Sequence, residues 1–208
     1  LFTTLNSIST LVLLKDTARA NAMLSRLSSF LRYSLVGERE GLATVAQEIE
    51  ALKLYLDIER TRFEDRLRTR FDVSPEALEG RIPSLLLQPI VENAIKYAVT
   101  PLEEGAEIHI DARVMGERLI VTLTDTGPGL GDAPLQDELP VTTSGTGVGL
   151  ANIRDRLQQA YGSDQRFEIA ENVPHGLIVL VDIPYQILDT RPNSASVAPA
   201  TTPGGKPE

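Results

Sequence analysis

Apolar residues recur at every third or fourth position in the N-terminal part of the chain, where they form two stripes. The two stripes consist of Leu1, Leu5, Ile8 and Val12, and of Leu24, Leu27, Leu31 and Leu35. This spacing predicts two helices, with Asp16 or Thr17 as the N-cap of the second. Two short helices with narrow stripes cannot bury these residues alone. We therefore expect the hairpin to pair with a second copy in a four-helix bundle.

A longer helix is predicted after the hairpin. Gly37 and Gly41 interrupt the apolar spacing, and Thr44 to Gln47 then match a capping box, in which side chains satisfy free backbone amides. The helix should follow the apolar positions Ile49, Leu52, Leu56 and Phe63. Five of its charged residues are expected to form a solvated face with pairs three or four residues apart. They are Glu48, Glu50, Asp57, Glu59 and Arg62.

The rest of the chain mixes helices with strands. Strands are expected at 66–74, 107–115, 119–124, 167–170 and 177–183, and helices at 84–99 and 150–161. Pro89 should disturb the first turns of its helix. The clearest strand is marked by the strictly alternating residues Ile108, Ile110, Ala112 and Val114. Gly116 and Glu117 can turn the chain directly into the next strand. Strands joined by hairpins favour an α+β two-layer sandwich over a parallel doubly wound sheet.

Composition limits the classes of function. The 208 residues are 42% hydrophobic and 24% charged, as in ordinary globular proteins. The net charge of −9 argues against a nucleic-acid partner. The absence of cysteine excludes disulfides, thiolate catalysis and zinc–cysteine sites. No apolar run approaches the roughly 20 residues that span a bilayer. Residues 187–208, rich in Pro, Ser, Thr, Ala and Gly from Asp189 onward, are expected to be a disordered tail.

The segment “SGTGVGLANI”, residues 144–153, is a candidate phosphate site. Glycines that lead into a helix leave free N–H groups and a helix dipole that favour anions. A dinucleotide-binding site needs its glycines directly after the first strand, and a P-loop needs a lysine in the loop. The segment meets neither requirement.

Two upstream segments, “ENAIKYA” and “DTGPGL”, give this loop a different meaning. Asp125 ends a predicted strand before two glycines, so its carboxylate can accept a hydrogen bond from an exocyclic amine such as that of adenine. Asn93 and Lys96 are three residues apart on one helix face. An amide oxygen can help to ligate Mg²⁺, and a nearby ammonium group can neutralise phosphate charge. Together these parts indicate a site for ATP and Mg²⁺.

These segments resemble the conserved boxes of the GHKL ATPases in their order and spacing. “ENAIKYA” is similar to the asparagine box, “DTGPGL” to the first glycine box and “GTGVGL” to the second. “LSSFLRYSL”, “YLDIERTRFEDRL” and “GVGLANIRDRLQQAYG” further resemble the LytS/YehU-type sensor histidine kinases of two-component signalling. The resemblance implies a dimerisation and phosphotransfer hairpin over residues 1–40. It also implies a Bergerat-type ATP-binding domain over residues 41–186.

The resemblance also implies roles for the residues of the asparagine box and the strand end. Asn93 would chelate Mg²⁺, with Glu92 beside it as a further catalytic contributor. Lys96 would contact the phosphates, and Tyr97 would stack on adenine. Asp125 would bind the adenine amine.

The glycines are implied to serve the same nucleotide. Gly127 and Gly129 would let the backbone approach the base, and residues 131–144 would form a lid over ATP. The ATP-binding residues of the second glycine box would be Gly145, Thr146, Gly147, Val148, Gly149 and Leu150.

The implied reaction is autophosphorylation of a histidine, followed by transfer to a response regulator, often of the LytTR type. The acceptor motif of the family reads P-H-F-L-F-N, and this sequence matches only its second half, with Thr3 in place of asparagine. The acceptor would lie two residues before Leu1. His109, expected on the solvated face of a strand, and His175, expected in a turn, are predicted to be structural.

Two alternatives remain open at the sequence level. One is a degenerate module that binds ATP and transmits signals without kinase activity, which the missing acceptor and Thr3 favour. The other, a GHKL ATPase that is not a kinase, is disfavoured because it would not need the hairpin or “YLDIERTRFEDRL”. The kinase interpretation implies a homodimer formed through the hairpin. It also implies that the chain is the cytoplasmic portion of a bacterial inner-membrane sensor kinase.

Overall fold

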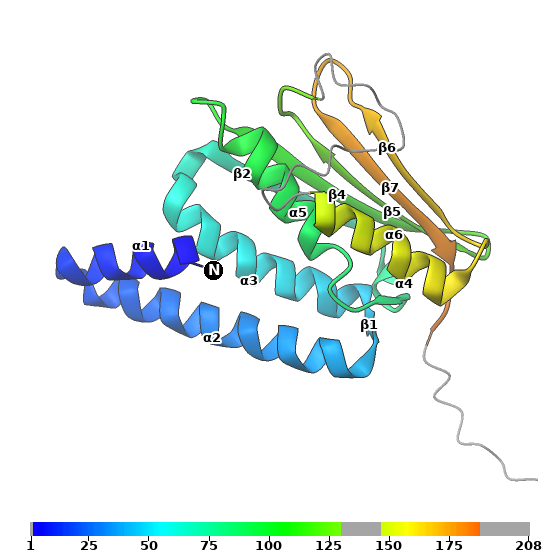
Figure 1. Cartoon of the computed structure of the whole chain (residues 1–208), viewed down its shortest axis with the longest axis horizontal. Helices are drawn as coiled ribbons and strands as arrows, with labels where there is room; N and C mark the ends of the chain where they lie inside the picture. Colours follow the sequence, from blue (N-terminus) through cyan, green and yellow to red (C-terminus); the bar gives the residue numbers. More distant parts are fainter. Residues whose placement is uncertain (1, 130–146, 188–208) are drawn as a thin grey trace, which may run out of the picture.

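The computed structural model describes residues 2–129 and 147–187, which form a helical hairpin, a layer of helices and a sheet (Figure 1). The α-helices are α1 (Phe2–Leu13), α2 (Thr17–Glu40), α3 (Val45–Phe63), α4 (Pro75–Leu78), α5 (Gln88–Ala94) and α6 (Gly147–Tyr161). The hairpin of α1 and α2 lies along α3, and α3 lies between the hairpin and the rest of the molecule. The arrangement confirms the predicted α+β class, with a hairpin followed by a mixed helix-and-sheet domain.

The hairpin buries only part of its predicted apolar stripes against α3. A small apolar cluster joins the hairpin to Ile58 of α3. The hairpin residues in this cluster are Ile8, Ala20, Met23, Leu27 and Phe30. Four stripe residues remain exposed, namely Leu5, Val12, Leu24 and Leu31. The hairpin therefore has an inner face on α3 and an outer apolar face, which we define by these four residues.

The ends of α2 differ partly from the prediction. Asp16 is the N-cap, because its Oδ1 accepts a hydrogen bond from the Arg19 amide at 3.2 Å. The predicted interruption at Gly37 is wrong, since α2 continues to Glu40. A glycine inside a helix costs only about 1 kcal/mol, which packing of the helix can outweigh. The chain leaves the helix at Gly41, whose φ is +74°. No helix within the described ranges is long and apolar enough to cross a membrane.

The capping box at the start of α3 is confirmed. The Gln47 amide donates to Thr44 Oγ1 at 3.2 Å, and the Thr44 amide donates to Gln47 Oε1 at 2.8 Å. The predicted solvated face is wrong at Glu48 and Glu59, which are 2% and 6% exposed. Both are buried because α3 has neighbours on two sides, the hairpin and the helix-and-sheet domain.

The main sheet has five strands in the order β2-β4-β5-β7-β6. The strands are β2 (Leu67–Val73), β4 (Ala106–Met115), β5 (Arg118–Asp125), β6 (Arg166–Glu171) and β7 (Leu177–Pro184). All neighbours are antiparallel except β2 and β4, which are parallel. The predicted alternation in β4 buries Ile108, Ile110 and Ala112 against the helices. His109 lies on the opposite face of β4, as predicted, with its Nε2 2.9 Å from Asp72 Oδ2.

Several short elements were not predicted. β1 (Leu42–Thr44) and β3 (Arg81–Pro83) form a two-stranded antiparallel sheet, and η1 (Glu64–Arg66) follows α3. The helix expected over residues 84–99 begins only at Gln88, because Pro89 suits the first turn of a helix better than its interior. It then widens into a π-helical turn, η2 (Ile95–Val99). Elements of three to five residues are too short to show a period in the sequence.

Candidate functional site

Asp125 lies at the end of β5, on the face of the sheet that the helices cover. Val121 and Leu123 are buried on this face, and the two-residue period of the strand carries Asp125 to the same side. Asp125 is 5% exposed. Burial raises the pKa of Asp125 because it disfavours the ionised form, while hydrogen bonds from the Gly127 and Leu177 amides oppose this shift.

Described residues occupy only one carboxylate oxygen of Asp125. Oδ1 accepts from the Gly127 amide at 2.9 Å and from the Leu177 amide at 3.2 Å. Within residues 2–129 and 147–187, no group donates to Oδ2. The fixed carboxylate can therefore accept a further hydrogen bond from a ligand N–H.

The turn between β6 and β7 packs directly on Asp125, which the sequence did not predict. Asn172 Nδ2 donates to the Asp125 carbonyl oxygen at 3.0 Å, and His175 Nδ1 lies 3.1 Å from the Gly127 carbonyl oxygen. Gly176 has a φ of +106°, and a Cβ there would lie 1.9 Å from the Asp125 carbonyl oxygen. The glycine in “NVPHG” was a signal for a special turn, but the sequence does not tell which strand end the turn meets.

Gly127, in the first glycine box, packs closely on the helix of the asparagine box. A Cβ at Gly127 would lie 2.4 Å from the Ala98 Cβ and 2.6 Å from the Ala98 Cα. Gly129 has a φ of +76°, a conformation that favours glycine. The structure thus brings two of the predicted boxes into contact at Ala98.

The asparagine box lies on α5, with its two polar residues in different environments. Glu92 is exposed and accepts a hydrogen bond from Gln88 Nε2 at 2.7 Å. Asn93 is half-buried, and its Nδ2 is buried without a hydrogen-bond partner in the described part of the chain. A buried polar atom without a partner is uncommon in a folded protein, so Asn93 fits a residue that contacts a ligand.

Lys96 and Tyr97 lie on the π-helical turn η2 and are exposed. The Lys96 Nζ atom lies 4.9 Å from the centre of the Tyr97 ring. The amide and the hydroxyl of Thr100 both donate to the Ile95 carbonyl oxygen at 2.9 Å, which fixes the wide turn. Such turns are frequent at functional sites. The π-turn begins at Ile95, between Asn93 and Lys96.

The second glycine box is described only in part. α6 begins at Gly147 and includes Val148 and Gly149. Leu150 packs against the main core, together with Ile153 and Leu157 farther along the helix. Gly145, Thr146 and the predicted lid over residues 131–144 lie outside the described residues, as does the predicted tail from residue 188.

The described residues contain no metal site that is built from acidic and histidine side chains alone. Over the described ranges, no group of three or more His, Asp or Glu side chains is arranged to hold a metal ion. Mg²⁺ commonly keeps several waters and binds through one or two protein groups together with substrate phosphates. The amide of Asn93 is compatible with that pattern.

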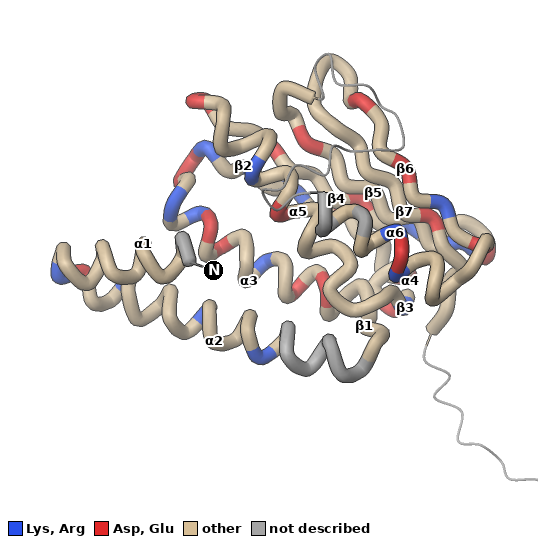
Figure 2. The backbone as a smooth tube through the Cα atoms, in the orientation of Figure 1, with Lys and Arg blue, Asp and Glu red and all other residues tan. Residues whose placement is uncertain are grey.

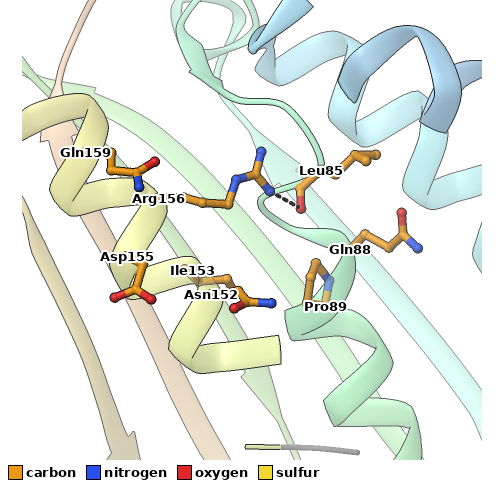
Figure 3. A pocket seen from close by; sticks show the side chains of 8 residues that line it. All are labelled: Leu85, Gln88, Pro89, Asn152, Ile153, Asp155, Arg156 and Gln159. Atoms are coloured by element: carbon orange, nitrogen blue, oxygen red, sulfur yellow. Dashed lines mark hydrogen bonds between the residues drawn. The ribbon is translucent and has the colours of Figure 1, made fainter. Parts of the chain in front are cut away.

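A separate groove lies between the start of α5 and α6 (Figure 3). It encloses about 480 Å³ and contains none of the predicted ATP-binding residues. Its lining consists of Leu85, Gln88, Pro89, Asn152, Ile153, Asp155, Arg156 and Gln159. The groove therefore does not coincide with the predicted nucleotide site.

Comparisons with known proteins agree with the geometry. The family described as “Histidine kinase-, DNA gyrase B-, and HSP90-like ATPase” matches residues 80–187, and the family “Histidine kinase” matches residues 1–67. The catalytic domain of the histidine kinase ThkA has a similar fold, in two nucleotide-free forms. The TM-scores are 0.53 and 0.55 at 18% and 16% identity, over 69% and 70% of this chain and 94% and 97% of those chains.

Similar curated proteins are sensor kinases. The sensor histidine kinase YesM of Bacillus subtilis is 32% identical over 88% of this chain and 31% of its own length. The sensor protein LytS of Enterococcus faecalis is 32% identical over 92% and 33%. The sensor histidine kinase BtsS of Escherichia coli is 34% identical over 82% and 28%. The chain thus spans about a third of the length of the curated relatives it matches. Because its model matches more than half of the chain, the chain belongs to the histidine kinase-, DNA gyrase B- and HSP90-like ATPase family.

Proposed function

We propose that this chain is the dimerisation and ATP-binding core of a protein-histidine kinase. The γ-phosphoryl group of ATP passes to a ring nitrogen of a histidine upstream of Leu1, and then to an aspartate of a response regulator, for which we propose the LytTR type. The observation that supports this function best is Asp125, a buried carboxylate with one oxygen held by two amides and the other without a described donor.

The adenine base is held by Asp125 through the exocyclic amine. Tyr97, which is exposed, stacks on the base, and Lys96 beside it contacts the phosphates. Gly127 and Gly129 are proposed to let the backbone approach the base. The residues proposed to bind the phosphates under the lid are Gly145, Thr146, Gly147, Val148, Gly149 and Leu150.

Asn93 is the residue that would hold Mg²⁺, with Glu92 beside it as a further polar contributor to catalysis. The side-chain oxygen of Asn93 is a suitable ligand, and its Nδ2, which lacks a partner in the described chain, can donate to a phosphate oxygen. Mg²⁺ bound there would neutralise charge on the transferred phosphoryl group. This arrangement needs no further acidic ligand from the protein.

The hairpin is proposed to form a homodimer through its outer apolar face. Leu5, Val12, Leu24 and Leu31 are exposed in the single chain, and α1 carries no charged residue (Figure 2). The acceptor histidine belongs to the same hairpin, just before α1. We place the chain on the cytoplasmic side of an inner-membrane sensor kinase, as the family suggests.

A binding and labelling experiment tests this function. Calorimetry should show that the chain binds MgATP, and that Asp125→Asn weakens binding at least tenfold, since a donor replaces one acceptor oxygen in a buried site (about 1.5–3 kcal/mol). Asp111→Asn is the control, because Asp111 lies on the other face of the sheet and pairs with Arg113. Equal affinity of Asp125→Asn and the unaltered chain would contradict the role of Asp125.

Labelling tests the phosphoryl transfer. Incubation with γ-labelled ATP should leave this chain unlabelled, because His109 and His175 lie in the sheet and in a turn of the ATP-binding domain. A longer chain with the P-H-F segment should acquire acid-labile phosphate, and its Asp125→Asn variant should not. Acid-labile phosphate on the present chain, or none on the longer one with its histidine present, would overturn the proposal.

A further inference from the structure

Glu48 is a buried carboxylate outside the nucleotide site that connects two parts of the molecule. It lies on α3 and is 2% exposed. Its Oε1 accepts hydrogen bonds from the Tyr33 hydroxyl at 2.7 Å and from the Leu85 amide at 2.6 Å. Its Oε2 accepts from the Leu87 amide at 3.2 Å. One carboxylate thus joins the hairpin helix α2 to the segment between β3 and α5.

The same segment, Ser84–Leu87, is held from its other side by α6. Arg156 donates from Nη1 to the Leu85 carbonyl oxygen at 3.3 Å, a contact drawn in Figure 3, and from Nη2 to the Ser84 carbonyl oxygen. Two amides of the segment therefore donate to Glu48, while two of its carbonyls accept from Arg156. Leu85 has a φ of +58°, which is unfavourable for a residue with a Cβ. Contacts on both sides stabilise this conformation.

Leu87 and Arg156 each connect this segment to a helix that carries predicted nucleotide-site residues. Leu87 immediately precedes α5, which carries Glu92 and Asn93, and no side chain caps the start of α5. Arg156 lies on α6, which begins within the second glycine box. A shift of the segment would therefore move the start of α5 relative to α6.

We propose that Glu48 and Arg156 are positioning residues, and that Ser84–Leu87 transmits the position of the hairpin, through Tyr33 and Glu48, to the nucleotide site. This inference rests on the proposed function, because it assumes that the site binds MgATP. Coupling between two sites is reciprocal, so nucleotide binding must in turn stabilise α2 near Tyr33. A purely structural role of Glu48 would fix the segment without this effect on the hairpin.

Hydrogen exchange of the 208-residue chain tests the transmission. Tyr33→Phe removes one hydroxyl on α2 and leaves both amides of the segment with their carboxylate. A saturating, non-hydrolysable MgATP analogue should slow amide exchange around Tyr33 at least about threefold in the unaltered chain. In Tyr33→Phe this protection should disappear, while affinity for the analogue stays within about twofold. Tyr185→Phe is the matched control, since its hydroxyl donates to the Glu76 carbonyl at 2.8 Å, and it should keep the protection.

Affinity tests the positioning role separately. Glu48→Gln keeps the side-chain volume but places an NH₂ group among backbone donors, so affinity for the analogue should fall about tenfold. Glu50→Gln, on the exposed side of the same helix, should leave affinity unchanged. If the unaltered chain does not bind the analogue, the proposed function fails and this inference fails with it. If it binds, equal protection of α2 in Tyr33→Phe or unchanged affinity in Glu48→Gln overturns the inference alone.

Discussion

Three carboxylates are buried in the described part of the chain, and each has different partners. Glu48 uses both oxygens to accept from two amides and a hydroxyl. Asp125 uses one oxygen to accept from two amides. Glu59 has a weaker partner, since its Oε2 lies 3.7 Å from Nη1 of Arg62, which is largely exposed. A buried charge with poor compensation is costly, so Glu59 should hold its proton more tightly than an ordinary glutamate.

Replacement of Glu59 should reveal this cost through pH. Burial raises the pKa of Glu59, with a smaller contribution from Glu92, while Arg62 lowers it. The folded state therefore binds this proton more tightly than the unfolded state. The resulting stabilisation is present below the ordinary glutamate pKa and is lost as the pH rises through the folded pKa. Glu59→Gln should thus raise the thermal midpoint at neutral pH, and the gain should vanish in acid.

The control for this prediction is Glu50→Gln on the same helix. Glu50 is exposed and pairs with Lys53 at 2.8 Å, and exposed pairs contribute little to stability. Its midpoint should follow that of the unaltered chain across the whole titration. A Glu59→Gln variant that is no more stable at neutral pH would show that Arg62 compensates the buried charge fully.

At the level of single residues, the sequence predicted side chains that are marked by their immediate neighbours. It did not predict which side chains are buried by segments far away in the sequence. Asp125 could be identified because strand alternation and following glycines are local signals. Glu48 and Glu59 resembled members of a solvated face because their spacing fits surface pairs equally well. Their burial depends on tertiary packing, as at Glu48, which lies where α2 and the segment before α5 pack on α3. The role of Asn172 was missed for the same reason, as its partner Asp125 is far away in the sequence.

At the level of elements, the contact between the turn after β5 and η2 shapes the predicted nucleotide site. The helix of the asparagine box ends in a π-turn, and Arg66 binds carbonyls at the end of this turn and just after it. Nη2 of Arg66 donates to the Val99, Thr100 and Leu102 carbonyl oxygens at 3.1, 3.2 and 2.7 Å. Gly127 packs on Ala98 within this turn. The element thus has little freedom to move away from the strand end.

Gly127→Ala should therefore damage both the fold and the site. The new Cβ would overlap backbone and side-chain atoms of Ala98, so we expect a loss of about 1–3 kcal/mol in the free energy of unfolding. Affinity for MgATP should fall as well, because relief of the overlap must separate the end of β5 from η2. Chemical denaturation and calorimetry measure the two effects.

Gly116→Ala provides a control for the glycine itself. Gly116 has a φ of +62°, but a Cβ there meets no described atom within 4 Å. Backbone strain alone should cost about 1–2 kcal/mol, with MgATP affinity unchanged. Equal affinity of Gly127→Ala and Gly116→Ala would mean that the contact with Ala98 does not shape the site.

Most elements with a clear period were predictable, whereas their pairing was not. Alternation identified β4 and β5, and the helical period identified α3 and α6. The parallel pairing of β2 with β4 is formed across α4, β3, α5 and η2, so no local pattern could reveal it. The domain boundary predicted between residues 40 and 41 remains a prediction.

At the level of the whole molecule, the outer apolar face of the hairpin remains uncovered in a single chain. Leu24 and Leu31 on α2 are 44% and 38% exposed and are seven residues apart, as are Leu5 and Val12 on α1. A repeat of seven residues is typical of helices that pack in bundles. The inner face already packs on α3, so a second hairpin would meet only the outer face.

The double variant Leu24→Glu, Leu31→Glu should therefore weaken dimerisation. Burial of each leucine contributes about 1.5–3 kcal/mol, and two buried charges would add repulsion, so sedimentation should detect monomers. Ala22→Glu, an exposed small residue of the same helix, is the control for an added charge. MgATP affinity should be unchanged, because the outer face is remote from Asp125. A monomeric unaltered chain, or a dimeric double variant, would contradict this interface.

The position of α3 between two apolar clusters limits how the hairpin and the helix-and-sheet domain can be exchanged between related proteins. Its residues Leu52 and Leu56 belong to the main core, whereas Ile58 belongs to the cluster under the hairpin, and Tyr55 contacts both. A chimera joined between α2 and α3 would set a foreign hairpin on a surface shaped for Met23 and Phe30. Recombination after Phe63 keeps the hairpin and α3 together, but it must then match the foreign core at Leu52 and Leu56. In both chimeras, the hairpin and the helix-and-sheet domain can be recombined only if α3 packs well on each of them.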